Sequence, residues 1–122
     1  MKTILIVEDE EVLLDIVGTV FRDAGYEVKK ASSAEEALRL SGSIPADLII
    51  SDVRRGEMDG FTLLERLRAT DTQKNIPFIF LTAYDEKDGL QRGLSLGAEA
   101  YITKPFDIDD LLERVMKLVP PT

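Results

Sequence analysis

Four short apolar runs of this 122-residue chain each end in polar residues that are able to do chemistry. The first run ends at the acids Glu8 and Asp9, the second at Asp52, and the other two at Thr82 and at Lys104. Carboxylates that converge repel one another, and a raised pKa or a bound hard cation relieves that repulsion. The chain contains no His and no Cys, so an all-oxygen ligand set favours magnesium, manganese or calcium over zinc.

Thr82 and Lys104 add complementary groups to this predicted acid site. A lysine neutralises an anion that the metal holds, and a threonine hydroxyl donates a hydrogen bond to the same anion. Plain structural explanations also exist: separately solvated loop acids, a surface lysine, and a threonine bonded to nearby backbone. The position of both acid groups directly after strands favours a site.

Composition excludes several classes of function. Without Cys there are no disulfides, and without His there is no Ser-His-Asp triad and no phosphohistidine on this chain. The net charge of -8 argues against direct binding of nucleic acid. No apolar run approaches the roughly 18 residues of a membrane span. The N-terminus leads straight into a strand without the pattern of a signal peptide, so we expect a cytoplasmic domain with no membrane contact.

The four runs are short, continuous and rich in β-branched residues, which predicts strands buried on both faces of a parallel sheet. A shorter and more polar run over 26–31 predicts an edge strand. Helical patterns alternate with these strands, after Glu10, after Ser33, after Asp59, over 86–96 and after Asp107. Five strands and five helices in strict alternation predict an α/β fold and one domain over residues 1–122. One reversal of winding sets the first and third strands side by side, and such sheets bind ligands beyond the carboxyl ends of their strands.

Taken together, the strand-end motifs resemble the receiver domain of two-component response regulators over the whole chain. In chain order they are Val7-Glu8-Asp9-Glu10, the stretch from Asp52 to Gly60, Leu81-Thr82-Ala83, and the stretch from Gly97 to Phe106. The resemblance implies a flavodoxin-like three-layer sandwich with a five-stranded parallel sheet of order 2-1-3-4-5 and five helices.

Site roles follow from the same resemblance. It makes Asp52 the phosphoacceptor and Thr82 and Lys104 the groups that contact the phosphoryl oxygens. The implied Mg²⁺ ligands are Glu8, Asp9, Asp52 and the backbone carbonyl of Arg54. Tyr101 is the implied switch residue, on a surface formed by the 86–96 helix, the strand of Tyr101 and the last helix. We also expect a cis peptide bond between Lys104 and Pro105.

The sequence departs from the family pattern at three positions. Glu8 stands where aspartate is common, Gly56 replaces a usual proline, and Arg55 replaces a usual apolar residue. The longer Glu8 side chain predicts a shifted metal or an intervening water, and the other two changes predict a looser, more basic loop beside the site. None of them removes a required group.

The predicted function is a signalling domain rather than an ordinary enzyme. It accepts a phosphoryl group on Asp52 from a sensor histidine kinase or phosphotransfer protein, hydrolyses it slowly, and acts on an output domain or downstream protein. A dimer that forms on phosphorylation also fits the family. On the first helix, Val12 and Leu14 are predicted to border a docking surface for the kinase.

Three alternatives remain open. The first is a pseudo-receiver that binds partners without phosphorylation, and the complete set of site residues argues against it. The second is a magnesium-dependent aspartyl phosphatase, which usually needs a second acid two residues after the nucleophile, where this chain has Arg54. The third is a flavodoxin, which is disfavoured because Glu8, Asp9 and Glu10 would repel a flavin phosphate.

Overall fold

One parallel sheet of five strands forms the centre of the molecule, in the order β2-β1-β3-β4-β5. The structure is a computed structural model, and it describes residues 1–43, 45–53, 58–71, 73–82 and 87–121. The strands are β1 (Thr3–Val7), β2 (Glu27–Ala31), β3 (Leu48–Ser51), β4 (Phe78–Thr82) and β5 (Ala100–Thr103). The predicted strand order is therefore confirmed, with β2 at one edge.

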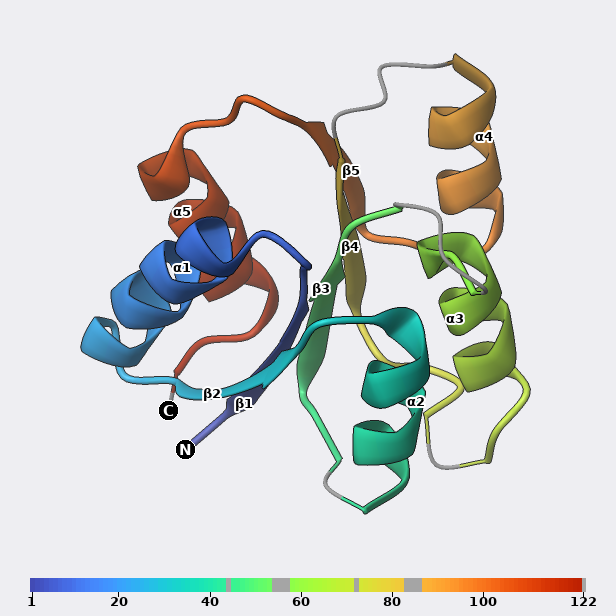
Figure 1. Ribbon diagram of the computed structural model, residues 1–122, viewed down its shortest axis with the longest axis horizontal. Coiled ribbons are helices and arrows are strands. Elements are labelled where there is room, and N and C mark those ends of the chain that lie inside the picture. The colour runs from blue at the N-terminus through green and yellow to red at the C-terminus, as the bar shows by residue number, and fades with distance from the viewer. Residues whose placement is uncertain (44, 54–57, 72, 83–86, 122) are drawn as a thin grey trace.

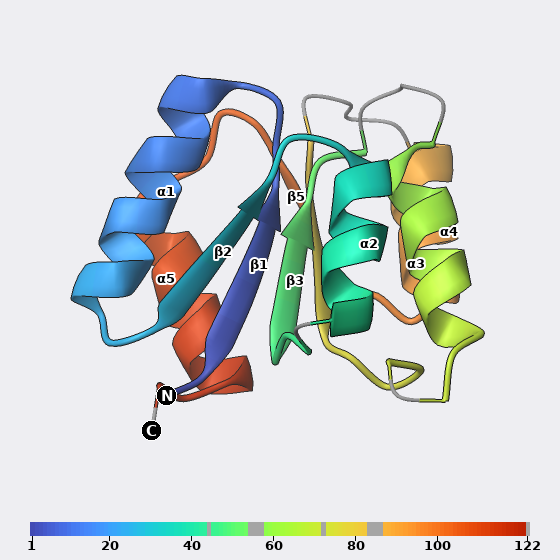
Figure 2. The same ribbon diagram turned by 60° about the horizontal axis from the view of Figure 1, so that its bottom comes forward.

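Helices cover both faces of this sheet (Figure 1). They are α1 (Glu11–Asp23), α2 (Ala34–Ser43), α3 (Gly60–Arg68), α4 (Lys87–Ser95) and α5 (Ile108–Leu118). Figures 1 and 2 show α1 and α5 against one face and α2, α3 and α4 against the other. This arrangement gives two apolar cores, one on each side of the sheet. The predicted start of α4 at Glu86 lies outside the described residues.

The strands are apolar because both their faces are covered. All residues of β1, β3 and β4 are buried. The edge strand β2 has two buried positions and three more exposed ones, as a strand covered on fewer sides does. The position of each strand end is thus fixed by a sheet that is packed on both faces.

Local signals set the helix ends. Asp107 caps α5, and its side chain accepts hydrogen bonds from the backbone N–H groups of Asp109 and Asp110. At the start of α2, the Ser33 hydroxyl oxygen accepts from the Glu36 N–H at 3.1 Å, and the Glu36 carboxylate accepts from the Ser32 N–H at 3.0 Å. The capping box predicted from Ser33 and Glu36 therefore forms, with Glu36 reaching back one residue further than Ser33 itself.

The outer face of α1 differs from the sequence prediction. Leu14 is buried with Val17 and Phe21, so it belongs to the core and does not border an exposed docking surface. Val12 and Ile16 are the exposed apolar residues of this helix, 74% and 51% accessible. The reason is that positions 14, 17 and 21 share one helical stripe, which faces the sheet.

The end of the described chain packs back on the start of β2. The Tyr26 hydroxyl donates to the Val119 carbonyl oxygen at 2.5 Å, and Tyr26 is 2% exposed. Both groups lie at the amino ends of the strands, opposite the predicted site. No helix in the described ranges combines the length and the hydropathy needed to cross a bilayer.

Candidate functional site

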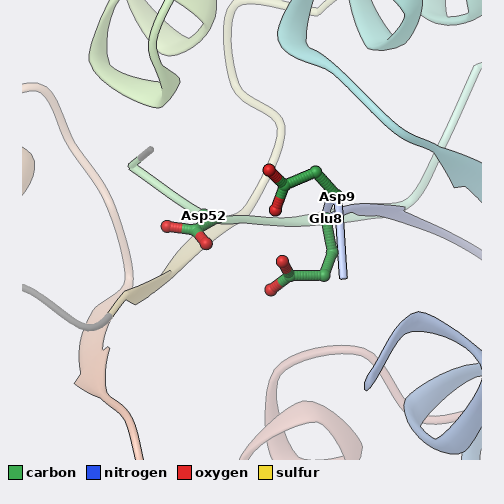
Figure 3. Close-up of side chains that lie close together, drawn as sticks. All are labelled: Glu8, Asp9 and Asp52. Carbon is green, nitrogen blue, oxygen red and sulfur yellow. The ribbon is translucent and has the colours of Figure 1, made fainter. Parts of the chain in front are cut away.

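Three acids converge where β1 and β3 end. Val7 and Ser51, the last residues of these neighbouring strands, are partners in the sheet register. The Asp52 N–H donates to the Val7 carbonyl oxygen at 3.1 Å, which aligns Asp52 with Glu8 and Asp9. One carboxylate oxygen from each acid lies within 4.8 Å of the others. Figure 3 shows the three side chains turned toward a common space, in the arrangement that a hard cation accepts.

Lys104 reaches into this cluster from the loop after β5. Its Nζ lies 2.6 Å from Glu8 Oε1 and 3.0 Å from Asp52 Oδ2. The side chains of Lys104, Glu8 and Asp52 are 13%, 3% and 7% exposed, so water screens these ion pairs weakly. Burial alone would lower the Lys104 pKa, but the hydrogen bonds and charges of Glu8 and Asp52 outweigh it, and the pKa is raised. The Lys104 side chain therefore keeps its positive charge at the site.

Glu8 is the most buried of the three acids. Burial raises its pKa, while the hydrogen bond from Lys104, the hydrogen bond from the Glu10 N–H and the Lys104 charge oppose that rise. The Glu10 N–H lies 3.1 Å from Glu8 Oε2, so each carboxylate oxygen of Glu8 already has a donor. Asp9 is exposed, whereas Asp52 is buried like Glu8. Of the three acids, Asp9 therefore has the most accessible carboxylate, and Glu8 is the one held by two donors.

Thr82 lies at the same edge of the sheet. It ends β4, is fully buried, and pairs in register with Thr103 of β5. The Lys104 N–H donates to the Thr82 carbonyl oxygen at 2.7 Å, which places the backbone of both residues side by side. The peptide bond between Lys104 and Pro105 is cis, which confirms that prediction.

The structure therefore brings Glu8, Asp9, Asp52, Thr82 and Lys104 to the carboxyl edge of four strands. Arg54, Arg55 and Gly56 lie outside the described residues. A cavity of about 190 Å³ opens over the acids. Its lining also includes residues that the motifs did not single out for the site, namely Ser32, Ser33, Met58 and Gly60.

Tyr101 lies apart from the acids, on β5 beside α4. Its ring centroid is 5.9 Å from that of Phe80. A Cβ built on Gly89 would lie 2.7 Å from the Tyr101 hydroxyl, and one built on Gly93 would lie 3.3 Å from the Tyr101 ring. The ring thus packs against the glycine face of α4.

A family model for the response regulator receiver domain matches residues 4–116. The DNA-binding dual master transcriptional regulator RpaA of Synechocystis is 35% identical over 122 residues, covering 100% of this chain and 51% of that regulator. Sporulation initiation phosphotransferase F of Bacillus subtilis is 36% identical over 119 residues, covering 98% of this chain and 94% of that protein. The chain thus spans about half the length of some curated relatives and nearly all of another.

Solved structures agree with these sequence relatives. Chemotaxis protein CheY4 of Vibrio cholerae superposes with a TM-score of 0.90 at 32% identity, covering 98% of this chain and 99% of that chain. The non-phosphorylated HemR receiver domain of Leptospira biflexa superposes with a TM-score of 0.89 at 33% identity, covering 100% of this chain and 97% of that chain. The fold therefore has close structural counterparts among solved receiver and chemotaxis proteins.

Proposed function

This chain belongs to the response regulator receiver domain family, and we propose that it accepts a phosphoryl group on Asp52. Receiver domains are signalling domains that histidine kinases phosphorylate. The observation that carries the proposal is the contact of Lys104 Nζ with both Glu8 and Asp52, beside the exposed carboxylate of Asp9. An acceptor carboxylate, a cation in contact with it and a group of acids able to hold a metal therefore lie side by side.

The proposed reaction is a direct phosphoryl transfer. A carboxylate oxygen of Asp52 attacks the phosphorus of a phosphohistidine, and the P–N bond breaks with its electrons returning to the imidazole nitrogen. The product is an acyl phosphate on Asp52. Because this chain has no His, the donor belongs to a partner protein. Later attack of water on phosphorus restores the carboxylate and releases inorganic phosphate.

The residues present fit a magnesium ion. Asp9 and Asp52 would supply direct carboxylate oxygens, Glu8 would act from its anchored position, and the Arg54 carbonyl remains part of the proposal. When bound, Mg²⁺ would offset charge on the transferring group. Lys104 would hold a phosphoryl oxygen as it now holds Asp52, and the Thr82 hydroxyl would donate to another.

Kinase docking is proposed on the exposed apolar part of α1. A groove of about 290 Å³ beside Lys104 is lined by Leu13, Ile16, Lys104, Pro105, Phe106 and Ile108. Val12, one helical turn before Ile16, is also exposed. A helix of the kinase or phosphotransfer protein that docks here would bring its phosphohistidine close to the acids.

Output is proposed through α4, β5 and α5. A phosphoryl group on Asp52 would draw the Thr82 hydroxyl toward it and change how α4 packs on Tyr101. Gly89 and Gly93 weaken α4 by about 1 kcal/mol each relative to alanine, which favours movement of this helix. The recipient would be an output domain or a downstream protein, since RpaA is about twice the length of this chain. We also propose a single cytoplasmic receiver domain over residues 1–122, with a dimer as one form of the phosphorylated state.

Other functions fit the site less well. An aspartyl phosphatase would lack its usual second acid, because Arg54 occupies that sequence position. A pseudo-receiver would not need Lys104 bonded to both Glu8 and Asp52. The cavity of about 190 Å³ is smaller than the 300–1,000 Å³ typical of cofactor pockets, which disfavours a flavin.

Intact-mass spectrometry after incubation with acetyl phosphate tests the proposal. We expect the mass of one phosphoryl group to appear when magnesium is present and to be absent when the metal is chelated. A protein that stays unmodified in both conditions would favour the pseudo-receiver.

A further inference from the structure

The main chain of Asp52 is held from three directions. Its N–H donates to Val7, as described above, and its carbonyl oxygen accepts from the Ser51 hydroxyl at 2.9 Å. Ser51 is fully buried, so water does not compete for this hydrogen bond. The third contact is Gly60, the first residue of α3, which packs directly against the same carbonyl group.

The space beside the Asp52 carbonyl group leaves no room for a side chain at position 60. A Cβ built on Gly60 would lie 2.5 Å from the Asp52 carbonyl oxygen and 3.3 Å from its carbonyl carbon. The first distance is far shorter than a non-bonded carbon and oxygen allow. Only Gly25 and Gly97 have positive φ among the described residues, so Gly60 is not explained by backbone conformation. Glycine is also a poor helix former, so α3 begins with an unfavourable residue where the Asp52 backbone approaches it.

The start of α3 has little freedom to retreat from a larger residue. Asp59 caps the helix, and its side chain accepts from the Thr62 N–H at 2.8 Å. Phe61 and Leu64 next to it are buried in the core on that face of the sheet. A methyl group at position 60 would therefore push the Asp52 carbonyl rather than the helix.

From these contacts we propose that Gly60, together with the Ser51 hydroxyl, positions the nucleophilic carboxylate of Asp52. This inference rests on the proposed function of Asp52 as phosphoryl acceptor. The Asp52 carboxylate now lies 3.0 Å from Lys104 Nζ and within reach of Asp9. A displacement on the order of 1 Å at a reacting group can slow a reaction about 100-fold, so small movements of this peptide matter.

The test compares phosphorylation kinetics of Gly60→Ala, Ser51→Ala and a control, Gly42→Ala. Gly42 lies in α2, and a Cβ built on it meets nothing within 4 Å. Each variant is phosphorylated with acetyl phosphate in saturating magnesium, and the folded fraction is measured by circular dichroism. We expect Gly60→Ala to lower the maximal rate per folded molecule at least 10-fold, on the scale of such displacements, with little change in the half-saturating donor concentration. Ser51→Ala should lower the rate several-fold, and Gly42→Ala should match the wild type.

The outcomes separate the two proposals. If the wild type is never labelled, the proposed function fails and this inference with it. If the wild type is labelled and folded Gly60→Ala reacts within twofold of it, the positioning role alone is wrong. A merely structural role would lower the folded fraction and leave the maximal rate per folded molecule unchanged. Should Gly60→Ala not fold, Ser51→Ala decides: a wild-type rate overturns the inference.

Discussion

The geometry of the site predicts a large loss of stability when Lys104 is replaced by methionine. Methionine keeps a similar length and removes the charge, so Glu8 and Asp52 lose their shared cation. Removing one partner of a buried ion pair typically costs roughly 3–5 kcal/mol, because the remaining charge stays buried and unpaired. Lys104 retains 13% exposure, so we expect the low end of that range.

The expected loss is about 3 kcal/mol of unfolding free energy without metal. For a chain of 122 residues this corresponds to a fall in Tm of about 12 °C. The variant should still fold, because domains of this size are stable by roughly 6–18 kcal/mol. Urea denaturation followed by circular dichroism, with the metal chelated, measures the loss.

Magnesium should restore part of this stability. At a free concentration of about 100 times the dissociation constant, binding to the wild type adds about 2.7 kcal/mol. Lys104 competes with the cation for Glu8 and Asp52, so its removal should tighten magnesium binding about tenfold, or 1.4 kcal/mol. The difference in unfolding free energy between the wild type and Lys104→Met should therefore shrink to roughly half in magnesium.

Lys117→Met is the matched control. Lys117 forms an exposed ion pair with Glu113, with side chains 76% and 67% accessible, so its loss should change stability by less than about 0.5 kcal/mol. The reasoning is refuted if Lys104→Met stays within about 1 kcal/mol of the wild type when the metal is chelated.

Two further changes test other parts of the account. Burial raises the Tyr26 pKa above its ordinary value of 10.0, so the unfolded chain ionises first as the pH rises. The resulting stability is complete below pH 10 and is lost as the pH rises through the folded pKa. Below pH 10, the free energy of unfolding of Tyr26→Phe should be about 1 kcal/mol lower than that of the wild type, because the hydrogen bond to Val119 is lost. Above about pH 10, urea denaturation should show that this free energy falls less steeply with pH in the variant than in the wild type. On α1, Val12→Ser with Ile16→Ser should slow phosphotransfer from the partner kinase at least tenfold, about 1.4 kcal/mol, and leave labelling by acetyl phosphate unchanged. Equal loss with both donors would contradict docking on this face.

The strands and the site edge could be predicted because their signals are local and strong. Buried parallel strands need continuous apolar runs, and residues 4–7, 48–50 and 78–81 are such runs. Once the strands are parallel, their carboxyl ends lie at one edge, so Asp9, Asp52 and Lys104 are expected at the same edge of the sheet. The strand order, with β1 beside β3, then brings the acids of these two strands together.

Features that depend on packing between distant elements could not be predicted from the sequence. Apolar periodicity marked a stripe on α1 but did not show that Leu14 faces the sheet while Ile16 faces solvent. Likewise, Gly60 appeared only as part of a motif, because its contact with the Asp52 carbonyl depends on how α3 is placed against β3. The ring of Tyr101 lies against α4 for a similar reason, since two glycines on that helix leave room for it.

Locating the phosphoryl group on the chain tests directly whether Asp52 is the acceptor. The protein is phosphorylated with acetyl phosphate in magnesium and treated with borohydride, which reduces an acyl phosphate of aspartate to homoserine. Peptide mass spectrometry then reads every acidic position in the chain. We predict homoserine at position 52 in the wild type, and no conversion in Asp52→Asn or when magnesium is chelated. Conversion at Asp9 or another acid with Asp52 intact, or undiminished labelling of Asp52→Asn, would contradict it.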